Sequence, residues 1–563
     1  MRFLENGPSI PDELLLARDQ GRVVFFCGAG VSRAKAGFAD FFGLASSVTS
    51  ELGVETNSPA LKLIDAAKDI TASTGVEGVV SADRIFGLLE REFLTSDIYK
   101  SVAKALTPEG EVDLSAHQTM LKLATTNDGI VRLVTTNFDR LFDLCKPDIH
   151  TFIPPRLPDL NHSVEFNGTV YLHGKVNEDG TGAASNGFVL SSSEFGDAYL
   201  ANGWATSFVK GILEKYVVVF VGYSADDPPI QYLLEALNKS SSHLNDIYAF
   251  QSGDESYASS KWHHKGVKAI AYDETNGHIA LWNTLESWAE RASNPDAWYQ
   301  GIITKAVMGP HLLLPFERGQ IAHIVSTTEG AKKFANSEIL APATWLHVFD
   351  PELRYEAPRK NLSGAENLTE MVDPFHFYSL DSDHTPQHVD PNDFYNKREV
   401  PTGAWDAFEF NSQDIKGTQD QRSIRFRGDD SSYPQFSTLP QRLNALTYWL
   451  SRVAEQPEVI WWVTKQQCLH PWVQLVLKSE CERRSKDMDS TLNEAWSYVL
   501  DGFEQTDKGG HLDWFTLERA IKNNGWCPRK LRQFEKVTKP FIKVTPPFRT
   551  PNEINREQLS LLN

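Results

Sequence analysis

The chain has 563 residues, more than one ordinary hydrophobic core holds, which predicts about two or three domains. Its 55 Lys and Arg against 74 Asp and Glu give a net charge of −19, which argues against nucleic acid as a partner of this chain alone. The five cysteines are scattered without a Cys-x-x-Cys pair, which argues against a ribbon-type zinc site and a disulfide framework.

The N-terminal stretch lacks the features of a targeting segment. It carries acidic side chains, with Pro8 and Pro11 where a signal peptide needs an unbroken apolar core. No apolar run along the chain reaches the roughly 18 residues that span a bilayer. We therefore expect a cytoplasmic protein without a membrane partner.

From Pro8 to about Asn294, short apolar runs of β type alternate with helical patterns. Continuous apolar strands separated by helices predict an α/β fold, with a Rossmann-like parallel sheet covered on both faces. Residues 55–110 have a helical pattern typical of an inserted subdomain. The predicted strands are 22–27, 130–136, 168–174, 216–223, 246–250 and 267–272, and the predicted helices include 11–20, 115–126 and 229–240.

The pattern changes after Trp288. Residues 300–350 still look folded, whereas 351–435 are rich in Asp, Pro, Ser, His and Asn and show no sustained period, which is typical of a loop-rich connection. A helical pattern returns at Leu439. We therefore expect an α/β catalytic domain at 1–294, a partly loop-rich connecting region at 295–435 and a largely helical domain at 436–563.

A glycine-rich turn follows the first predicted strand. Gly28 and Gly30 would let the backbone approach a pyrophosphate at the start of a helix, which is the context that a dinucleotide-binding loop requires. Arg33 stands where the usual third glycine would be. The turn alone is equally compatible with a tight structural turn.

Polar residues follow three further strands. Thr136, Asn137 and Asp139 come after the strand at 130–136, at the sheet edge where ligands bind in open α/β folds, although Asp139 also fits a helix cap. His173 follows the next strand and fits either a catalytic group or a satisfied loop residue. The stretch 222–224 (Gly222, Tyr223, Ser224) fits a ribose contact or an ordinary strand-to-helix loop.

The order of these motifs resembles that of the NAD-binding motifs of the sirtuin superfamily, over about residues 10–290. The resemblance implies that NAD is bound by these residues. Those similar to the family's phosphate loop, lid, Asn motif and ribose motif are Gly28, Ala29, Gly30, Val31, Ser32, Asp40, Phe41, Thr136, Gly222, Tyr223 and Ser224. Asn137, Asp139 and His173 stand at the positions that carry catalysis.

Three departures separate the chain from the deacylases of that superfamily. Phe42 stands where they have Arg, no cysteine occurs between Cys145 and Cys468 for their four-cysteine zinc module, and the interval from His173 to Gly222 is short. The chain instead resembles the minimal sirtuin-like domains of bacterial anti-phage systems, such as Thoeris and the defence-associated sirtuins. That resemblance implies a Rossmann-like sirtuin fold without the zinc module, an NAD hydrolase and no metal.

The resemblance also implies roles. Asn137 would hold a water and a ribose hydroxyl, Asp139 would fix the loop or contact the carboxamide side, and His173 would act as a general base. The alternatives are a protein deacylase or ADP-ribosyltransferase, or a non-catalytic module that binds NAD or ADP-ribose and regulates a partner.

Residues 300–563 carry no catalytic signature. By analogy with defence sirtuins, this half would sense a phage protein, hold the hydrolase inactive or drive homo-oligomer assembly. A partner defence protein, such as a HerA-type ATPase or an Argonaute, is a further expectation from the resemblance.

Overall fold

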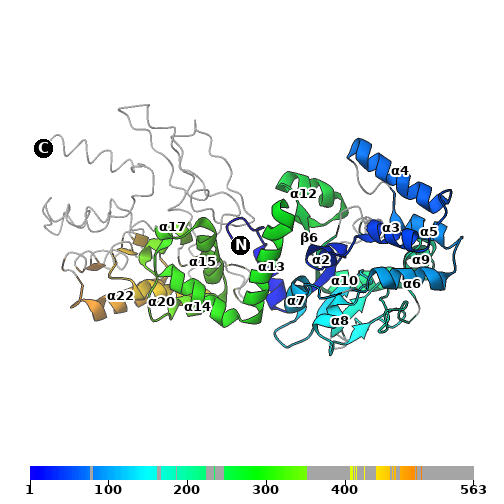
Figure 1. Ribbon diagram of the computed structural model, residues 1–563. Helices are drawn as coiled ribbons and strands as arrows, with labels where there is room; N and C mark the ends of the chain where they lie inside the picture. The colour runs from blue at the N-terminus through cyan, green and yellow to red at the C-terminus, as the bar shows by residue number, and fades with distance from the viewer. Residues whose placement is uncertain are drawn as a thin grey trace. The chain divides into compact units, whose positions relative to one another are not determined.

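The computed structural model forms two compact units (Figure 1). The first, here the α/β unit, is Asn6–Pro295, and the second, here the helical unit, is Met1–Glu5 with Asp296–Asn563. Described are residues 1–75, 80–108, 110–160, 166–185, 187–223, 234, 246–350 and, with gaps, 406–497. The predicted helix at 229–240, apart from position 234, and nearly all of the predicted connection at 351–435 lie outside the described residues.

A parallel sheet of seven strands forms the centre of the α/β unit, in the order β3-β4-β2-β1-β5-β6-β7. Its strands are β1 (Val23–Cys27), β2 (Arg132–Thr135), β3 (Thr151–Phe152), β4 (Gly168–Tyr171), β5 (Val217–Val221), β6 (Ile247–Ser252) and β7 (Lys268–Tyr272). The prediction of a parallel α/β sheet is confirmed, and each of the six predicted strands overlaps an observed one. The sequence missed β3, because two residues are too few to form a pattern.

Burial explains why these segments are strands. β1 and β5 lie side by side, Val23 opposite Val217 and Cys27 opposite Val221, and every residue of both is buried. A central parallel strand needs apolar side chains on both faces, and β-branched residues fit that pleated surface. The chain leaves β1 toward β2 on one side and reaches β5 on the other, so the strand order reverses at β1.

Helices cover the sheet and form an inserted subdomain. Helices α3, α4, α5, α6 and α9 gather beside one another, as Figure 1 shows, which agrees with the helical pattern predicted for 55–110. The helices of this unit are α1 (Asp12–Asp19), α2 (Ala29–Ala34), α3 (Phe41–Glu51), α4 (Pro59–Thr74), α5 (Ala82–Leu89), α6 (Thr95–Ala105), α7 (Ser115–Ala124), α8 (Leu141–Cys145), α9 (Ser192–Gly196), the π-helix η1 (Asp197–Ala201), α10 (Trp204–Lys215), α12 (Glu255–Trp262), the 3-10 turn η2 (His263–Lys265) and α13 (Thr275–Ser293).

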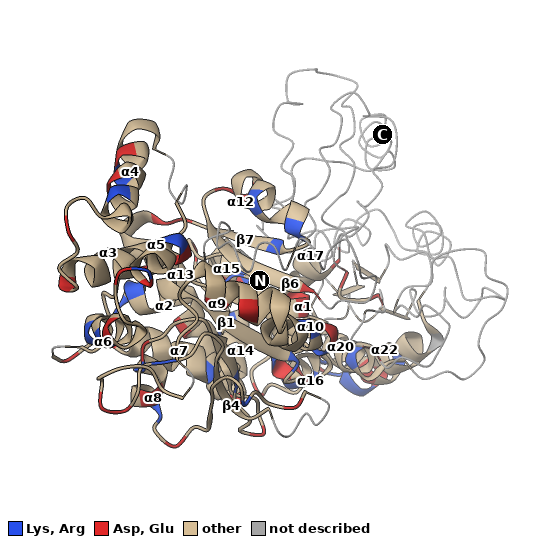
Figure 2. Cartoon of the chain, turned by 90° about the vertical axis from the view of Figure 1, so that its right-hand side faces the viewer, with Lys and Arg blue, Asp and Glu red and all other residues tan. Residues whose placement is uncertain are grey.

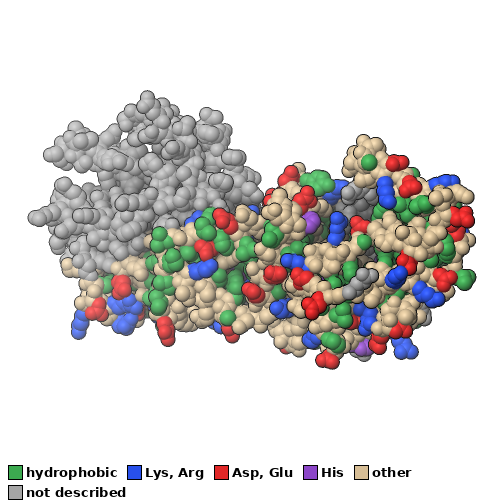
Figure 3. All heavy atoms as spheres, viewed as in Figure 1, with side chains coloured by type: hydrophobic (Ala, Val, Ile, Leu, Met, Phe, Trp, Pro, Cys, Tyr) green, Lys and Arg blue, Asp and Glu red, His purple; other side chains and the backbone are tan. Residues whose placement is uncertain are grey.

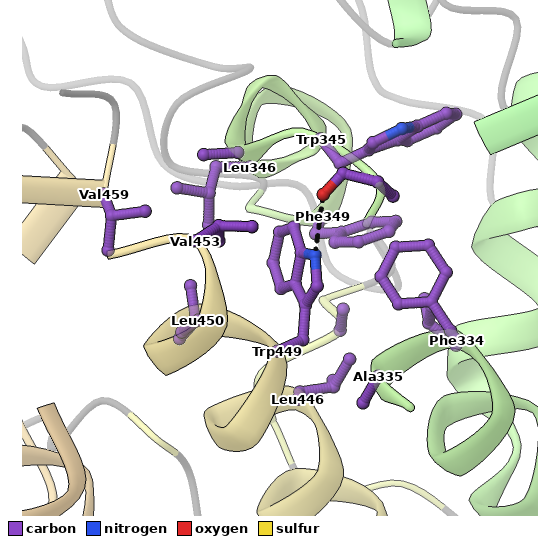
Figure 4. Packing of buried hydrophobic residues seen from close by; sticks show 14 of the residues in the cluster. Phe334, Ala335, Trp345, Leu346, Phe349, Leu446, Trp449, Leu450, Val453 and Val459 are labelled. Atoms are coloured by element: carbon purple, nitrogen blue, oxygen red, sulfur yellow. Dashed lines mark hydrogen bonds between the residues drawn. The ribbon is translucent and has the colours of Figure 1, made fainter. Parts of the chain in front are cut away.

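The regular elements described in the helical unit are all helical. They are α14 (Pro295–Ala306), η3 (Pro310–Leu312), α15 (Pro315–Ser326), α16 (Thr328–Ala335), η4 (Ala343–Trp345), α17 (Leu346–Phe349), α20 (Gln441–Arg452) and α22 (Pro471–Arg484). Trp449 lies at the centre of their apolar core, with its ring centroid 5.5 Å from that of Phe334 and 5.7 Å from that of Phe349 (Figure 4). The neighbouring Tyr448 is 49% exposed.

Charged side chains of both signs share the same elements. Helix α4 carries basic and acidic residues (Figure 2), and the face drawn in Figure 3 shows the two signs interspersed over the described residues. Within the described part of the chain, no helix is long and apolar enough to cross a membrane.

Candidate active site

The loops after β1 and β5 meet at the point where the strand order reverses. Gly30 N donates to Gly222 O at 2.9 Å, and a Cβ on Gly30 would lie 2.7 Å from Gly222 Cα. Gly222 has φ +73°, in the left-handed region that favours glycine. The glycines therefore let two backbone loops pack together, a role that the sequence did not separate from ligand contact.

Ser32 is the hub of a buried polar cluster. Its hydroxyl donates to Asp139 Oδ2 at 2.7 Å and accepts from Asn137 Nδ2 at 2.9 Å. Asn137 Nδ2 also donates to Gly28 O at 3.1 Å, which ties the loop after β2 to the loop after β1. All three side chains are buried. Asp139 Oδ1 in addition accepts from Leu141 N at 3.0 Å, so the helix-cap interpretation of Asp139 is also present.

His117 on α7 belongs to this cluster, and sequence reasoning missed it. Its Nε2 lies 3.2 Å from Ser32 Oγ, and its ring packs edge-on against Phe142 at 4.7 Å. Since the single hydroxyl proton of Ser32 goes to Asp139, His117 Nε2 is assigned as the donor, and Nδ1 is left without a partner among the described residues. Burial lowers the pKa of His117, against a smaller raising effect of Asp139, which keeps the ring neutral.

His173 lies just beyond the end of β4 and is 4% exposed. Its Nε2 lies 2.9 Å from Tyr199 Oη, and its ring centroid lies 5.1 Å from that of Phe195 and 6.4 Å from that of Phe138. Burial lowers the pKa of His173 to about 3. The imidazole is therefore neutral near pH 7.

One cavity of about 100 Å³ brings the strand-end residues together, several times the space that one water molecule needs. The loops after β1, β2 and β4 form one part of its wall, and the inserted subdomain forms the other. It is lined by Ala29, Ser32, Phe38, Ala39, Asp40, Phe41, Leu44, Ser81, Asp83, Leu106, Thr136, Asn137, Phe138, Asp139, His173 and Phe195.

The predicted lid residues form the start of α3. Asp40 caps this helix, since its Oδ1 accepts from Gly43 N at 2.8 Å. Phe41 stacks on Phe86 of α5 at 5.5 Å, and Phe42 packs against the same apolar cluster. Phe42, where the deacylases have Arg, therefore contributes apolar packing.

The predicted site residues divide into three groups. Ala29, Ser32, Asp40, Phe41, Thr136, Asn137, Asp139 and His173 line the cavity. Gly28, Gly30, Val31, Gly222 and Tyr223 are not among its lining residues; the Tyr223 hydroxyl lies 2.9 Å from Thr136 Oγ1 and holds that residue. Ser224 lies outside the described residues. Across the described part of the chain, no group of His, Cys, Asp or Glu side chains has an arrangement that would hold a metal ion.

A buried polar cluster at the strand-end edge of a parallel sheet defines a ligand-binding α/β domain. Residues 131–270 match the family model described as "SIR2-like domain". Residues 131–270 are thus similar to a SIR2-like domain, in agreement with the resemblance of the ordered motifs.

Two individual proteins are similar to the chain. "Uncharacterized protein y4cA" of Sinorhizobium fredii (strain NBRC 101917 / NGR234) is 30% identical over 326 residues, which are 55% of this chain and 26% of that protein. The chain thus spans about a quarter of the length of this curated relative. A solved structure titled "Crystal structure of a SIR2 homolog-NAD complex" is 12% identical, covers 52% of this chain and 97% of that one, and has a TM-score of 0.27.

Proposed function

We propose that this chain is an NAD hydrolase, which cleaves NAD to nicotinamide and ADP-ribose with water as the nucleophile. The observation that carries the proposal is the convergence of Ser32, Asn137, Asp139 and His173 on one cavity of a SIR2-like domain. NAD as the ligand class rests on the resemblance of the ordered motifs.

The cluster suits cleavage of a glycosidic bond to a cationic leaving group. Positive charge spreads over the ribose ring as nicotinamide departs, and the buried Asp139 carboxylate would stabilise it. Asn137 is fixed by Ser32 and Gly28, so it would orient a water and a ribose hydroxyl at little entropic cost. Neutral His173 would accept the proton that the hydroxyl or the water loses.

The remaining cavity walls suit the apolar part of the ligand. Phe38, Phe41 and Phe195 offer ring surfaces for nicotinamide, while Ala29 leaves room beside the loop after β1. Gly28, Gly30 and Val31 amides already donate to Val221, Gly222 and Gly28 carbonyls. The phosphate-binding role of this loop therefore rests on the resemblance, and in our proposal the loop positions the pyrophosphate mainly by allowing its close approach.

In our proposal the enzyme acts in the bacterial cytoplasm and depletes NAD during phage infection. The helical unit, oligomer assembly, a phage protein or a partner defence protein such as a HerA-type ATPase or an Argonaute would gate it. These roles rest on the resemblance to the defence-associated sirtuins.

Product analysis tests the proposed reaction. The full-length protein is incubated with NAD, alone and with candidate activators, and nicotinamide and ADP-ribose are separated by chromatography. We expect both products in equal amounts, and a loss of at least about a hundredfold for His173→Ala because a positioned base is removed. His263→Ala is the matched control, because His263 is exposed at the end of α12.

Two outcomes contradict the proposal. Binding of NAD without turnover in every assembly state would favour the non-catalytic regulator. Transfer of label from NAD to protein, or deacylation of a peptide, in place of free ADP-ribose would favour the transferase or deacylase.

A further inference from the structure

Two aromatic side chains, Phe195 and Tyr199, pack against the His173 ring. Tyr199 Oη lies 2.9 Å from His173 Nε2, yet Tyr199 is not among the residues that line the cavity. Phe195 does line the cavity, and its ring stacks on that of Tyr199 at a centroid distance of 6.1 Å. These two stacked rings, here called the plug, therefore lie against His173, and one of them also forms part of the cavity wall.

The plug is held in place by the elements around it. Tyr199 is on the π-helix η1, directly after α9, and its carbonyl oxygen accepts from Thr206 Oγ1 at 2.7 Å. Glu194 of α9 accepts from Tyr99 of α6 at 2.8 Å and closes a capping box with Ser191. These bonds connect α9 and η1, which carry the two rings, to the inserted subdomain. The positions of the two rings are therefore fixed by their surroundings.

We propose that Tyr199, backed by Phe195, limits the nucleophile at His173 to the size of water and so makes the domain a hydrolase instead of a transferase. This inference rests on the proposed NAD hydrolysis. In this proposal an alcohol or a protein side chain would need the space next to His173 Nε2, which the Tyr199 hydroxyl and ring occupy. Water needs no such opening, because Asn137 and His173 can hold it within the cavity.

The competing reactions differ only in the acceptor. In each, the bond between ribose C1′ and the nicotinamide nitrogen breaks, and its electron pair leaves with nicotinamide. The oxygen of water or of an alcohol forms the new bond to C1′, and its proton passes to neutral His173. Water gives ADP-ribose, and methanol gives the O-methyl glycoside of ADP-ribose.

The ratio of the methanol product to the water product tests whether the Tyr199 ring limits the size of the nucleophile. The full-length protein turns over NAD in a few per cent methanol, and the ratio of O-methyl product to ADP-ribose is measured by mass spectrometry. We expect Tyr199→Ala to raise this ratio about tenfold, since discrimination by the size of a pocket typically has this magnitude. Because both products come from the same active molecules, the ratio does not depend on the folded fraction.

Three further variants make the test specific. Tyr199→Phe keeps the ring, and Leu200→Ala changes the neighbouring residue, which is 83% exposed on the same π-helix, so both should keep the wild-type ratio. Tyr199→Val opens the same space and is expected to raise the ratio as Tyr199→Ala does. It serves as the replacement if Tyr199→Ala folds poorly.

The outcomes separate this inference from the proposed function. A wild-type ratio in both Tyr199→Ala and Tyr199→Val, or an equal rise in Tyr199→Phe, overturns the role of the ring. Loss of all nicotinamide release in both opened variants, with Tyr199→Phe active, also contradicts it, because the ring would then be needed for hydrolysis itself. Absence of nicotinamide release in the wild type instead overturns the proposed hydrolase.

Discussion

Several buried polar side chains of the helical unit bond to backbone carbonyls, whereas a cluster in the α/β unit bonds side chain to side chain. In the helical unit, Arg318 donates to Pro310 O at 2.9 Å, and the indole nitrogens of Trp345 and Trp449 donate to Ala306 O and Ala341 O. Each of these groups holds a backbone carbonyl in place. In the α/β unit, Ser32 and Asn137 bond instead to one another and face a cavity.

This difference indicates where chemistry is located. A buried donor that only caps a carbonyl compensates for its own desolvation and leaves nothing for a ligand. Polar side chains that line a cavity beside a neutral histidine can still form hydrogen bonds to a bound molecule. The comparison supports placing the proposed catalysis in the α/β unit, and four predictions test or sharpen it.

The largest expected effect is on the stability of the helical unit. Arg442 donates to Asp414 Oδ2 at 3.1 Å and to Ala407 O at 2.5 Å, and both partners of the ion pair are fully buried. Arg442→Leu should lower the free energy of unfolding by about 3–5 kcal/mol, because it leaves the Asp414 charge buried and unpaired. Denaturant unfolding measures this change.

Two companion variants sharpen the result for Arg442. The double variant Arg442→Leu with Asp414→Leu should recover part of the loss, because it removes the unpaired charge. Arg483→Ala, which removes an exposed pair with Glu480, should change stability little. A full-size loss from Arg483→Ala would contradict the distinction between buried and exposed pairs.

A smaller effect is expected at the hub of the site. Ser32→Ala removes one hydroxyl that Asn137, Asp139 and His117 all contact, and each unpaired buried group costs about 1–3 kcal/mol. We expect nicotinamide release to fall roughly 10- to 100-fold, through misplacement of Asn137. Ser260→Ala, whose hydroxyl bonds only a carbonyl of α12, is the control. Unchanged nicotinamide release by Ser32→Ala would contradict the role of the Ser32 hydroxyl in placing Asn137.

The pH dependence of stability gives a third test. The pKa of His173 is lowered to about 3 in the folded chain, whereas an unfolded histidine has a pKa near about 6.5. The unfolded chain thus binds more protons below pH about 6.5, so stability falls as the pH drops through that window, by up to about 1.4 kcal/mol per pH unit. Urea unfolding at several pH values should show a smaller slope for His173→Asn. His263→Asn should keep the wild-type slope, and the same slope in all three proteins would contradict the neutral His173.

The smallest effect is expected at Tyr223. Its hydroxyl lies 2.9 Å from Thr136 Oγ1, and Tyr223→Phe removes one such bond worth about 0.5–1.5 kcal/mol. We expect a loss of nicotinamide release of roughly two- to tenfold, from looser placement of Thr136 in the cavity wall. Tyr257→Phe, at a half-exposed ring on α12, should have no effect. A change as large as that of His173→Ala would instead give Tyr223 a direct part in the reaction.

The sequence predicts the sheet and the strand-end residues because both depend on local patterns. A run such as 23–27 is apolar throughout, and a polar residue after such a run falls at the edge where ligands bind. Asn137, Asp139 and His173 could be found in this way, and the structure places all three on one cavity.

The remaining site residues depend on contacts between distant parts of the chain. His117 is 85 residues from Ser32 in sequence, and its only local signal is a histidine on the apolar face of a helix that also holds Met120 and Leu121. Tyr199 has no motif at all, and the packing of Gly30 against Gly222 needs both loops in place. Such pairings follow from the tertiary fold and not from the spacing of residues.

The rate of nicotinamide release by Asn137→Ala tests the central claim most directly. Asn127→Ala is the matched control, because Asn127 is exposed in the turn before β2. With NAD and the full-length protein, we predict wild-type release for Asn127→Ala and a loss of at least about a hundredfold for Asn137→Ala, because the group that orients water and ribose is gone. Equal release by Asn137→Ala and the wild type would contradict the assignment of NAD hydrolysis to this cavity.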